Sequence, residues 1–319
     1  MVHGGGHIML SRKDIRPKQT QWLLDNGLLP VSVDYRLCPE APLLEGPISD
    51  VCSALQWARR VLPNLKLQRS DIHPNGDKVV VVGWSTGGTL SMTLAWTAPA
   101  RGLKPPDAIL AFYCPTNYSS DFWRLPNFPA NTASMAAEPY DLLEGVQDSP
   151  IIAYNVPPGK RPLGGWMSVS DPRSRIALHM NWKGQALPVL LGGLPSKNSL
   201  STTDSDGNAQ QAQWQSLPQP DATKIAAVCP YTQITQGNYR VPTYLIHGTQ
   251  DDLIPWQQTQ KTWDALVEQG MTAGGEIVEG AVHLFDLYGD REGRNWEVVK
   301  RGYEFLFERL GIRESTGSG

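Results

Sequence analysis

The sequence lacks the features that mark a membrane protein, a nucleic-acid-binding protein or a disulfide-stapled protein. No apolar run reaches the roughly 18 residues that a membrane span needs. The net charge is −3 without a long run of one sign, which argues against nucleic acid or an anionic membrane as the main partner. Only four cysteines occur, and their spacing fits no metal site, so we expect free intracellular thiols and a cytoplasmic protein: Cys38, Cys52, Cys114 and Cys229.

Apolar residues, in contrast, are plentiful and regularly arranged. They make up 40% of the 319 residues, which is enough to build a sizeable core. Short apolar segments alternate with amphipathic ones, and this alternation predicts an α/β fold with a mostly parallel sheet flanked by helices. Strands are predicted at residues 30–34, 78–82, 108–113, 242–247 and 275–279.

Three helices are predicted from apolar positions spaced three and four residues apart. The first has Ser49 as its capping residue and extends to Leu62. The second starts at Pro255 and stops at Gly270, and the third covers residues 296–310.

The region between these core segments is irregular and rich in Pro, Trp, Gly and Asn. We therefore predict a hydrolase-type core at 1–115 and 241–312, a cap at 116–240, and a disordered tail at 313–319. Residues 195–220 are polar and are predicted to form a mobile loop. Four tryptophans of the cap could line an aromatic pocket or fill a small core of the cap itself: Trp123, Trp166, Trp182 and Trp214.

A G-x-S-x-G motif at residues 83–87 predicts a nucleophilic serine. It follows the apolar residues 79–82 and precedes the helix-compatible residues 89–96. A strand, a sharp turn and a helix are the context in which this motif exposes its serine to a base. Ser85 is therefore the predicted nucleophile.

Two further segments supply a predicted base and acid. His283 follows the last predicted strand and is the predicted base. Asp251 closes an H-G-x-x-D segment and is predicted to orient that histidine, while Asp252 is assigned to stabilising the loop or the helix start. His247, which opens the segment, is predicted to be structural.

The segment His3-Gly4-Gly5-Gly6 predicts an oxyanion hole. Glycines allow the backbone to approach a substrate with its amides facing inward. The N–H groups of Gly5 and Gly6, with that of Thr86 after the nucleophile, are the predicted donors. His7 follows the glycines, and its role is left open.

These motifs together resemble the hormone-sensitive-lipase-like branch of the α/β-hydrolases. The resemblance rests on residues 3–6, V-D-Y-R-L-C-P-E at 33–40, Asp50 and the serine motif, and covers nearly the whole chain except the cap. Trp84-Ser85-Thr86 departs from the Asp-Ser-Ala of most members. Residues 7–39, 79–98 and 104–115 are similar to the esterase-type releasing domain at the C-terminus of fungal non-reducing polyketide synthases.

The resemblance implies a serine thioesterase that takes an acyl chain from an acyl carrier protein and hydrolyses it to an aromatic acid. No metal or redox cofactor is implied. Release by water, by an internal hydroxyl or by another nucleophile is left open. Two alternatives stand beside it: a free-standing carboxylesterase or lactonase acting on a small-molecule ester, and a non-catalytic binding module with a hydrolase fold.

The resemblance also implies a strand directly before His3, beside the strand that carries Ser85, and two earlier strands. Only Met1 and Val2 precede His3. We therefore expect the N-terminal strands to be missing, either because the chain is a fragment of a longer polypeptide or because its start was assigned too late.

Overall fold

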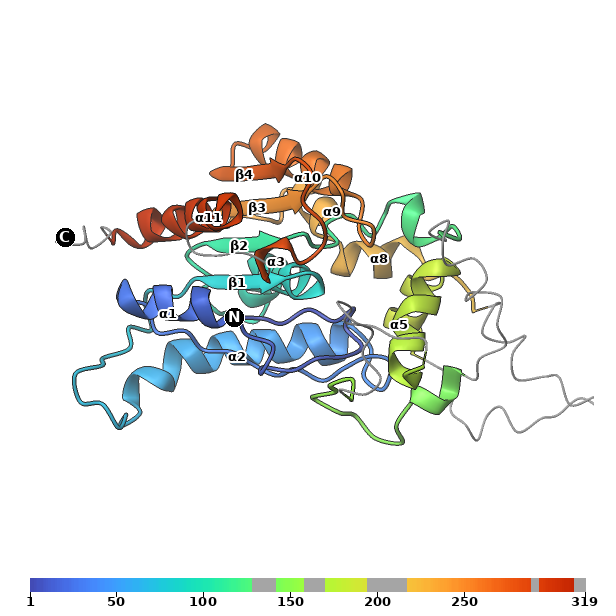
Figure 1. The fold of residues 1–319 in the computed structure, drawn as a ribbon, viewed down its shortest axis with the longest axis horizontal. Helices are drawn as coiled ribbons and strands as arrows, with labels where there is room; N and C mark the ends of the chain where they lie inside the picture. Colours follow the sequence, from blue (N-terminus) through green and yellow to red (C-terminus); the bar gives the residue numbers. More distant parts are fainter. Residues whose placement is uncertain (128–141, 158–169, 194–216, 288–292, 313–319) are drawn as a thin grey trace, which may run out of the picture.

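The computed structural model describes residues 1–127, 142–157, 170–193, 217–287 and 293–312. Its centre is a parallel four-stranded sheet in the order β1-β2-β3-β4 (Figure 1). The strands are β1 (Val81–Trp84), β2 (Ile109–Phe112), β3 (Thr243–Gly248) and β4 (Ala273–Val278). The predicted parallel sheet is therefore confirmed, and four of the five predicted strands are present.

The predicted strand at 30–34 is wrong. Val33 forms only an isolated parallel bridge to Val2, which is bridged to Gly83 on its other side. An apolar cleft of about 740 Å³ lies between residues 28–33 and residues 79–82. No continuous ladder of backbone hydrogen bonds can form across it, so residues 30–34 do not become a strand.

Each face of the sheet is covered by its own helices, because successive side chains of a strand point to opposite faces. Ile109, Ala111 and Leu245 pack against α3 (Thr86–Ala100) and α10 (Trp256–Glu268). Leu110, Phe112 and Ile246 pack against α11 (Arg294–Leu310) on the other face. The predicted helices near 256–270 and 296–310 are thus confirmed with small shifts of their ends.

The helix predicted from Ser49 is present as α2 (Ser49–Arg60), but Ser49 is not its cap. The π-helical turn η1 (Leu44–Ile48) leads directly into α2, so Ser49 already has helical backbone angles. Its side chain therefore makes no capping hydrogen bond. The other described helices and short helical turns are α1 (Pro17–Asp25), η2 (Leu62–Asn64), η3 (Asp121–Trp123), η4 (Leu142–Gly145), α5 (Pro172–Trp182), α6 (Ala186–Gly192), α8 (Ala222–Val228), α9 (Pro230–Thr235) and η7 (Phe285–Leu287).

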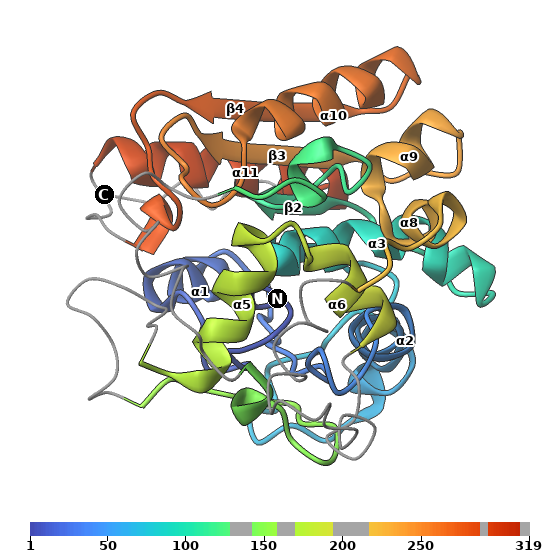
Figure 2. The same ribbon diagram turned by 90° about the vertical axis from the view of Figure 1, so that its right-hand side faces the viewer.

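Helices α5 and α6 lie beyond the carboxyl ends of the strands. Figure 1 places α5 past the arrowheads, and Figure 2, seen from that side, shows α5 and α6 in front of the core. Both helices belong to the predicted cap, whose boundaries remain a prediction. Trp166, Trp214, most of the predicted loop at 195–220 and the predicted tail at 313–319 lie outside the described residues. Within the described residues, no helix is long and apolar enough to cross a membrane.

A buried ion pair fastens α5 to the core. The Arg173 side chain is fully buried and forms a bidentate pair with Glu40, with N–O distances of 2.6 and 2.7 Å. The same guanidinium donates to the carbonyl oxygens of Ile8 and Cys38. Arg173 therefore holds the cap helix against the segment that follows the glycine loop.

We expect Arg173→Met to lower the free energy of unfolding by about 3–5 kcal/mol, because it leaves the buried Glu40 carboxylate without its partner. The double variant Glu40→Met/Arg173→Met should lose less than the sum of the two single changes. Chemical denaturation measures all three. The control is Arg124→Met, which breaks the exposed pair with Asp121 and should cost at most about 1 kcal/mol. Equal losses for Arg173→Met and Arg124→Met would contradict the anchoring role.

Candidate active site

Ser85 lies on a strained turn between β1 and α3. Its φ of 52° is in the left-handed region that non-glycine residues rarely adopt. Two glycines make the turn possible. A Cβ on Gly83 would lie 2.2 Å from the carbonyl oxygen of Gly87, and a Cβ on Gly87 would lie 2.3 Å from the carbonyl oxygen of Val2. The serine motif therefore needs glycine on both sides of Ser85 for steric reasons.

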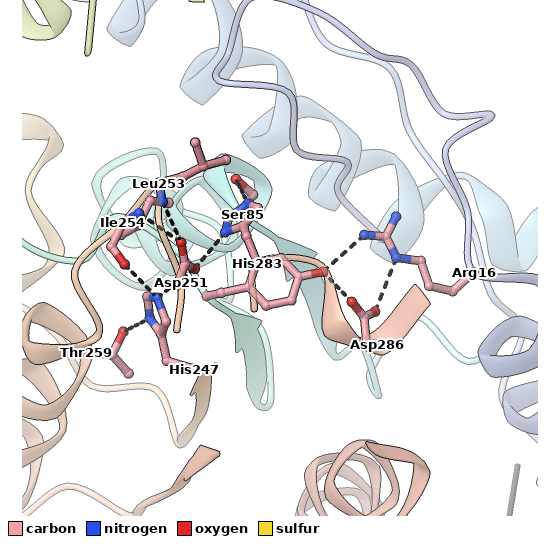
Figure 3. A network of polar contacts seen from close by, with 10 residues as sticks. Arg16, Ser85, His247, Asp251, Leu253, Ile254, Thr259, His283 and Asp286 are labelled. Carbon is pink, nitrogen blue, oxygen red and sulfur yellow. Dashed lines mark hydrogen bonds and ion pairs between the residues drawn. The ribbon is translucent and has the colours of Figure 1, made fainter. Parts of the chain in front are cut away.

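The structure brings Ser85, His283 and Asp251 together in one chain of contacts (Figure 3). The Nε2 atom of His283 lies 3.2 Å from the Oγ atom of Ser85, and its Nδ1 atom lies 2.7 Å from Oδ2 of Asp251. The three residues follow β1, β4 and β3, whose carboxyl ends meet at one edge of the parallel sheet. This is the geometry in which a histidine can accept the serine proton.

The Asp251 carboxylate is buried and surrounded by donors. Its Oδ1 atom accepts the N–H groups of Leu253 and Ile254, both at 2.9 Å, and its Oδ2 atom lies 3.0 Å from Nε2 of His247. Burial, the largest effect, would raise the pKa of Asp251. The charge of His283 and the hydrogen bonds of both histidines outweigh burial and hold the pKa below its usual value. Asp251 is therefore ionised at neutral pH.

His247 lies next to Asp251, away from Ser85, in agreement with the structural role predicted for it. Its Nε2 atom also lies 3.1 Å from the carbonyl oxygen of Ile254, which can only accept, so this nitrogen carries the hydrogen. Its Nδ1 atom lies 2.6 Å from the Thr259 hydroxyl. Asp252 has neither of the two roles predicted for it, because it does not bind the loop and α10 begins after Pro255 with no acidic residue in its first turn. It is exposed and its side chain makes no hydrogen bond within the described residues, while Asp251 itself binds the loop amides.

The glycine loop lies against the serine turn. A Cβ on Gly4 would lie 2.9 Å from the Cβ of Ser85. Gly5 and Gly6 have φ values of 97° and 67°, which favour glycine. No hydrogen bond within the described residues uses the N–H of Gly5 or Gly6. Together with Thr86, these glycines line the cavity beside Ser85, so free amide donors are available there.

Tyr35 supports the glycine loop from behind. Its hydroxyl donates to the carbonyl oxygens of His3 and Gly4, at 2.9 and 3.1 Å. Its ring stacks on the His3 imidazole with a centroid distance of 4.2 Å. The tyrosine of the V-D-Y-R segment therefore fixes the backbone that carries the candidate oxyanion donors.

His7, whose role the sequence left open, connects the same loop to the nucleophile helix. Its backbone N–H donates to the Thr86 hydroxyl at 3.2 Å, and its Nε2 atom lies 3.0 Å from the Tyr118 hydroxyl. Burial, with a smaller contribution from the charge of His3, lowers the pKa of His7 to about 3. His7 is thus a neutral supporting residue.

A cavity of about 110 Å³ opens at Ser85, and its wall is largely apolar and aromatic. Trp123 and Trp182 both line this cavity and are also buried, so for these two residues the pocket and core alternatives both apply. The cap helices contribute Ala177, Met180 and Leu190, and the glycine loop region contributes Met9 and Leu10. Arg16 brings the one guanidinium among the lining residues that the structure describes.

A second polar cluster beside His283 was missed by the sequence analysis. The Tyr113 hydroxyl donates to Asp286 and accepts a hydrogen bond from Nη2 of Arg16 at 3.2 Å. Nε of Arg16 lies 3.2 Å from Oδ2 of Asp286. Tyr113 and Asp286 are 173 residues apart and neither belongs to a local motif, so no sequence pattern could pair them.

Comparison with known families gives two matches. Residues 1–143 match the model of a family described by the alpha/beta hydrolase fold, and residues 195–313 match the model of the prolyl oligopeptidase family. Solved esterases have the same fold. A carboxyl esterase of the fungus Tuber melanosporum aligns with a TM-score of 0.54 and 16% identity, over 97% of this chain and 77% of that one. An esterase of Thermogutta terrifontis aligns with a TM-score of 0.56 and 18% identity, over 99% and 84%. The predicted α/β-hydrolase fold is confirmed.

Curated relatives are much more similar in sequence. The chain is 65% identical over 310 residues to 5-methylorsellinic acid synthase of Aspergillus terreus. It is 55% identical over 320 residues to non-reducing polyketide synthase pkbA of Emericella nidulans. Each match covers 97% of this chain and 12% of the relative's length. The predicted resemblance to fungal non-reducing polyketide synthases is confirmed.

The two neighbouring aspartates provide a test of the site. Asp251→Asn should lower kcat by about 10⁴-fold, because an amide no longer fixes the imidazole tautomer or stabilises its protonated form. Asp252→Asn should change kcat only slightly, because its exposed carboxylate has no such partner. Steady-state kinetics on an activated aryl ester compares the two, and a larger loss for Asp252→Asn would reverse the assignment.

Proposed function

We propose that this chain, which has the α/β-hydrolase fold, hydrolyses the thioester of a carrier-bound aromatic polyketide through an acyl-Ser85 intermediate. The observation that carries this proposal is the contact of His283 with both Ser85 and Asp251 at the floor of an aromatic cavity. The similarity to fungal polyketide synthases supports the substrate class. Because the chain spans 12% of those relatives, the carrier itself is part of the proposal.

In the first step, Ser85 Oγ attacks the thioester carbonyl carbon while Nε2 of His283 takes the hydroxyl proton. The N–H groups of Gly5, Gly6 and Thr86 stabilise the negative oxygen that forms. The C–S bond then breaks, and the departing sulfur takes the proton from His283. The carrier leaves as a free thiol and the acyl chain remains as an ester on Ser85.

In the second step, water replaces the thiol. His283 removes a proton from the water molecule, and the resulting hydroxide attacks the acyl-Ser85 ester. Collapse of the second tetrahedral intermediate returns the proton from His283 to Ser85 Oγ and releases a carboxylic acid. Asp251 keeps the hydrogen of the neutral imidazole on Nδ1 and stabilises the imidazolium in both steps. These steps use no metal ion and no redox cofactor.

The cavity supports an aromatic acyl group. Its volume of about 110 Å³ is of the same order as the ~150 Å³ apolar cavity that accepts a benzene ring. Trp84, Trp123 and Trp182 are among its lining residues. Flat aromatic surfaces favour offset or edge-on contacts with another ring.

Two other functions are possible for this fold. Two of the structurally similar proteins are esterases, which favours a free-standing carboxylesterase or lactonase with the same catalytic residues, acting on a small-molecule ester. A non-catalytic binding module is disfavoured, because Ser85, His283 and Asp251 are all present and in contact.

Kinetics on matched substrates separates these functions. The same aromatic acyl group is offered as the phosphopantetheine thioester of an acyl carrier protein and as a p-nitrophenyl ester. We expect kcat/KM for the carrier thioester to exceed that for the ester by at least about tenfold, because carrier contacts add binding energy to the transition state. Ser85→Ala is the control and should abolish turnover of both. Hydrolysis of the ester alone would favour the free-standing esterase, and turnover of neither would favour the binding module.

A further inference from the structure

The aromatic ring of Tyr113 lies directly against the imidazole of His283. Their ring centroids are 4.6 Å apart and their planes are tilted by 60°. Tyr113 follows β2 at the carboxyl edge of the sheet and is completely buried. Because Asp251 and Ser85 contact the two nitrogens of His283, Tyr113 supplies a third, aromatic side to the same imidazole.

The backbone of Tyr113 is held in an unfavourable conformation. Its φ of 37° lies in the left-handed region, which a bulky aromatic residue rarely adopts. Its N–H donates to the carbonyl oxygen of Ile246 at 2.6 Å, so the conformation is fixed by the neighbouring strand. Ser85, one strand away, has the same kind of strain at the same edge. Strained residues of this kind concentrate at functional sites.

The hydroxyl of Tyr113 fixes the ring and enriches it in electrons. It donates to Asp286, whose other oxygen accepts hydrogen bonds from Arg16 and Gln19. Burial, and then the Asp286 charge, raises the pKa of Tyr113 well above its usual value, so the residue remains a phenol. A phenol that donates to a carboxylate has a more negative ring face, and a negative ring face attracts a cation.

We propose that Tyr113 is a positioning residue that acts through His283, because its ring stabilises the imidazolium formed when that histidine takes a proton. This inference rests on the proposed hydrolysis through Ser85. Tyr113 is then a second residue, besides Asp251, that stabilises the imidazolium, and it lies on a different side of the imidazole. Asp286 has a supporting part, because it orients the phenol and compensates the charge of Arg16.

The charged and titratable groups around His283 come from each neighbouring element. The negatively charged Asp251 carboxylate and the Tyr113 ring contact the imidazole on two different sides. Arg16, before α1, carries a positive charge, and its guanidinium is paired with Asp286 and donates to the Tyr113 hydroxyl. Within the described residues, other titratable groups near this site include His247 and Asp252 around the loop after β3, Asp286 in η7, and Tyr118 in the wall of the cavity.

The first test compares Tyr113→Leu with Tyr113→Phe by the pH dependence of kcat/KM on an aryl ester. Removing the ring should lower kcat by about 3- to 30-fold with KM changed less than twofold, given the usual strength of cation–π contacts. Because the ring favours the protonated imidazole, its removal should move the acidic limb of the profile to lower pH. Tyr113→Phe keeps the ring but loses the hydroxyl contact with Asp286, so its kcat and its acidic limb should lie between those of the wild type and Tyr113→Leu.

Tyr239→Leu is the matched control. Tyr239 is equally buried and its hydroxyl contacts Thr243, but it packs on the other side of the sheet, away from His283. It should lose stability without moving the acidic limb. A loss of kcat in Tyr113→Leu with an unmoved limb, or an equal loss in Tyr113→Phe, would overturn the proposal.

If Tyr113→Leu does not fold, a protein with pentafluorophenylalanine at position 113 is compared with Tyr113→Phe instead. Phenylalanine and pentafluorophenylalanine at position 113 have nearly the same shape, but fluorine reverses the charge of the ring face. The fluorinated protein should have a lower kcat and an acidic limb at lower pH than Tyr113→Phe. Identical profiles would refute the role of Tyr113 while leaving the proposed function intact. If wild-type protein neither hydrolyses any ester nor reacts with a fluorophosphonate at Ser85, both proposals fail.

Discussion

The 3.2 Å contact between Ser85 Oγ and His283 Nε2 is the interaction on which the rest of the site depends. These residues are 198 positions apart in the sequence, and only the parallel order of β1, β2, β3 and β4 brings them to one edge. A serine hydroxyl is a weak nucleophile unless a base lies within hydrogen-bond reach. The strained turn at Ser85 and the loop after β4 must therefore hold these two atoms within hydrogen-bond distance.

Buried polar contacts hold both Ser85 and His283 in these positions. Beneath His283, the Asp251 carboxylate is held by two backbone amides and by His247. Beside Ser85, Tyr35 fixes the glycine loop. Above both, the Arg173–Glu40 pair holds α5 over the cavity. Each of these groups is buried, so the loss of one partner leaves an unsatisfied polar group that destabilises the geometry of the site.

The parts of this arrangement that could be predicted from sequence are those with a local pattern. Ser85 has its glycines within two positions, Asp251 lies in a five-residue segment, and four strands are short apolar runs. The strand at 30–34 was predicted wrongly because an apolar run does not reveal whether a neighbouring strand pairs with it. The pairs Tyr113–Asp286 and Arg173–Glu40 could not be predicted because more than 100 residues separate the two partners of each pair. None of the four residues lies in a local sequence pattern that would have indicated its partner.

Rapid-quench mass spectrometry can detect the ester on Ser85 through which we propose that the acyl chain passes. The protein is mixed with an aromatic acyl thioester, quenched in acid within milliseconds and digested. The account predicts a mass increase equal to the acyl group on the peptide that carries Ser85, formed before the steady state and absent from Ser85→Ala. Hydrolysis of the thioester with no acylated peptide, or with the acyl group on another residue, would contradict it.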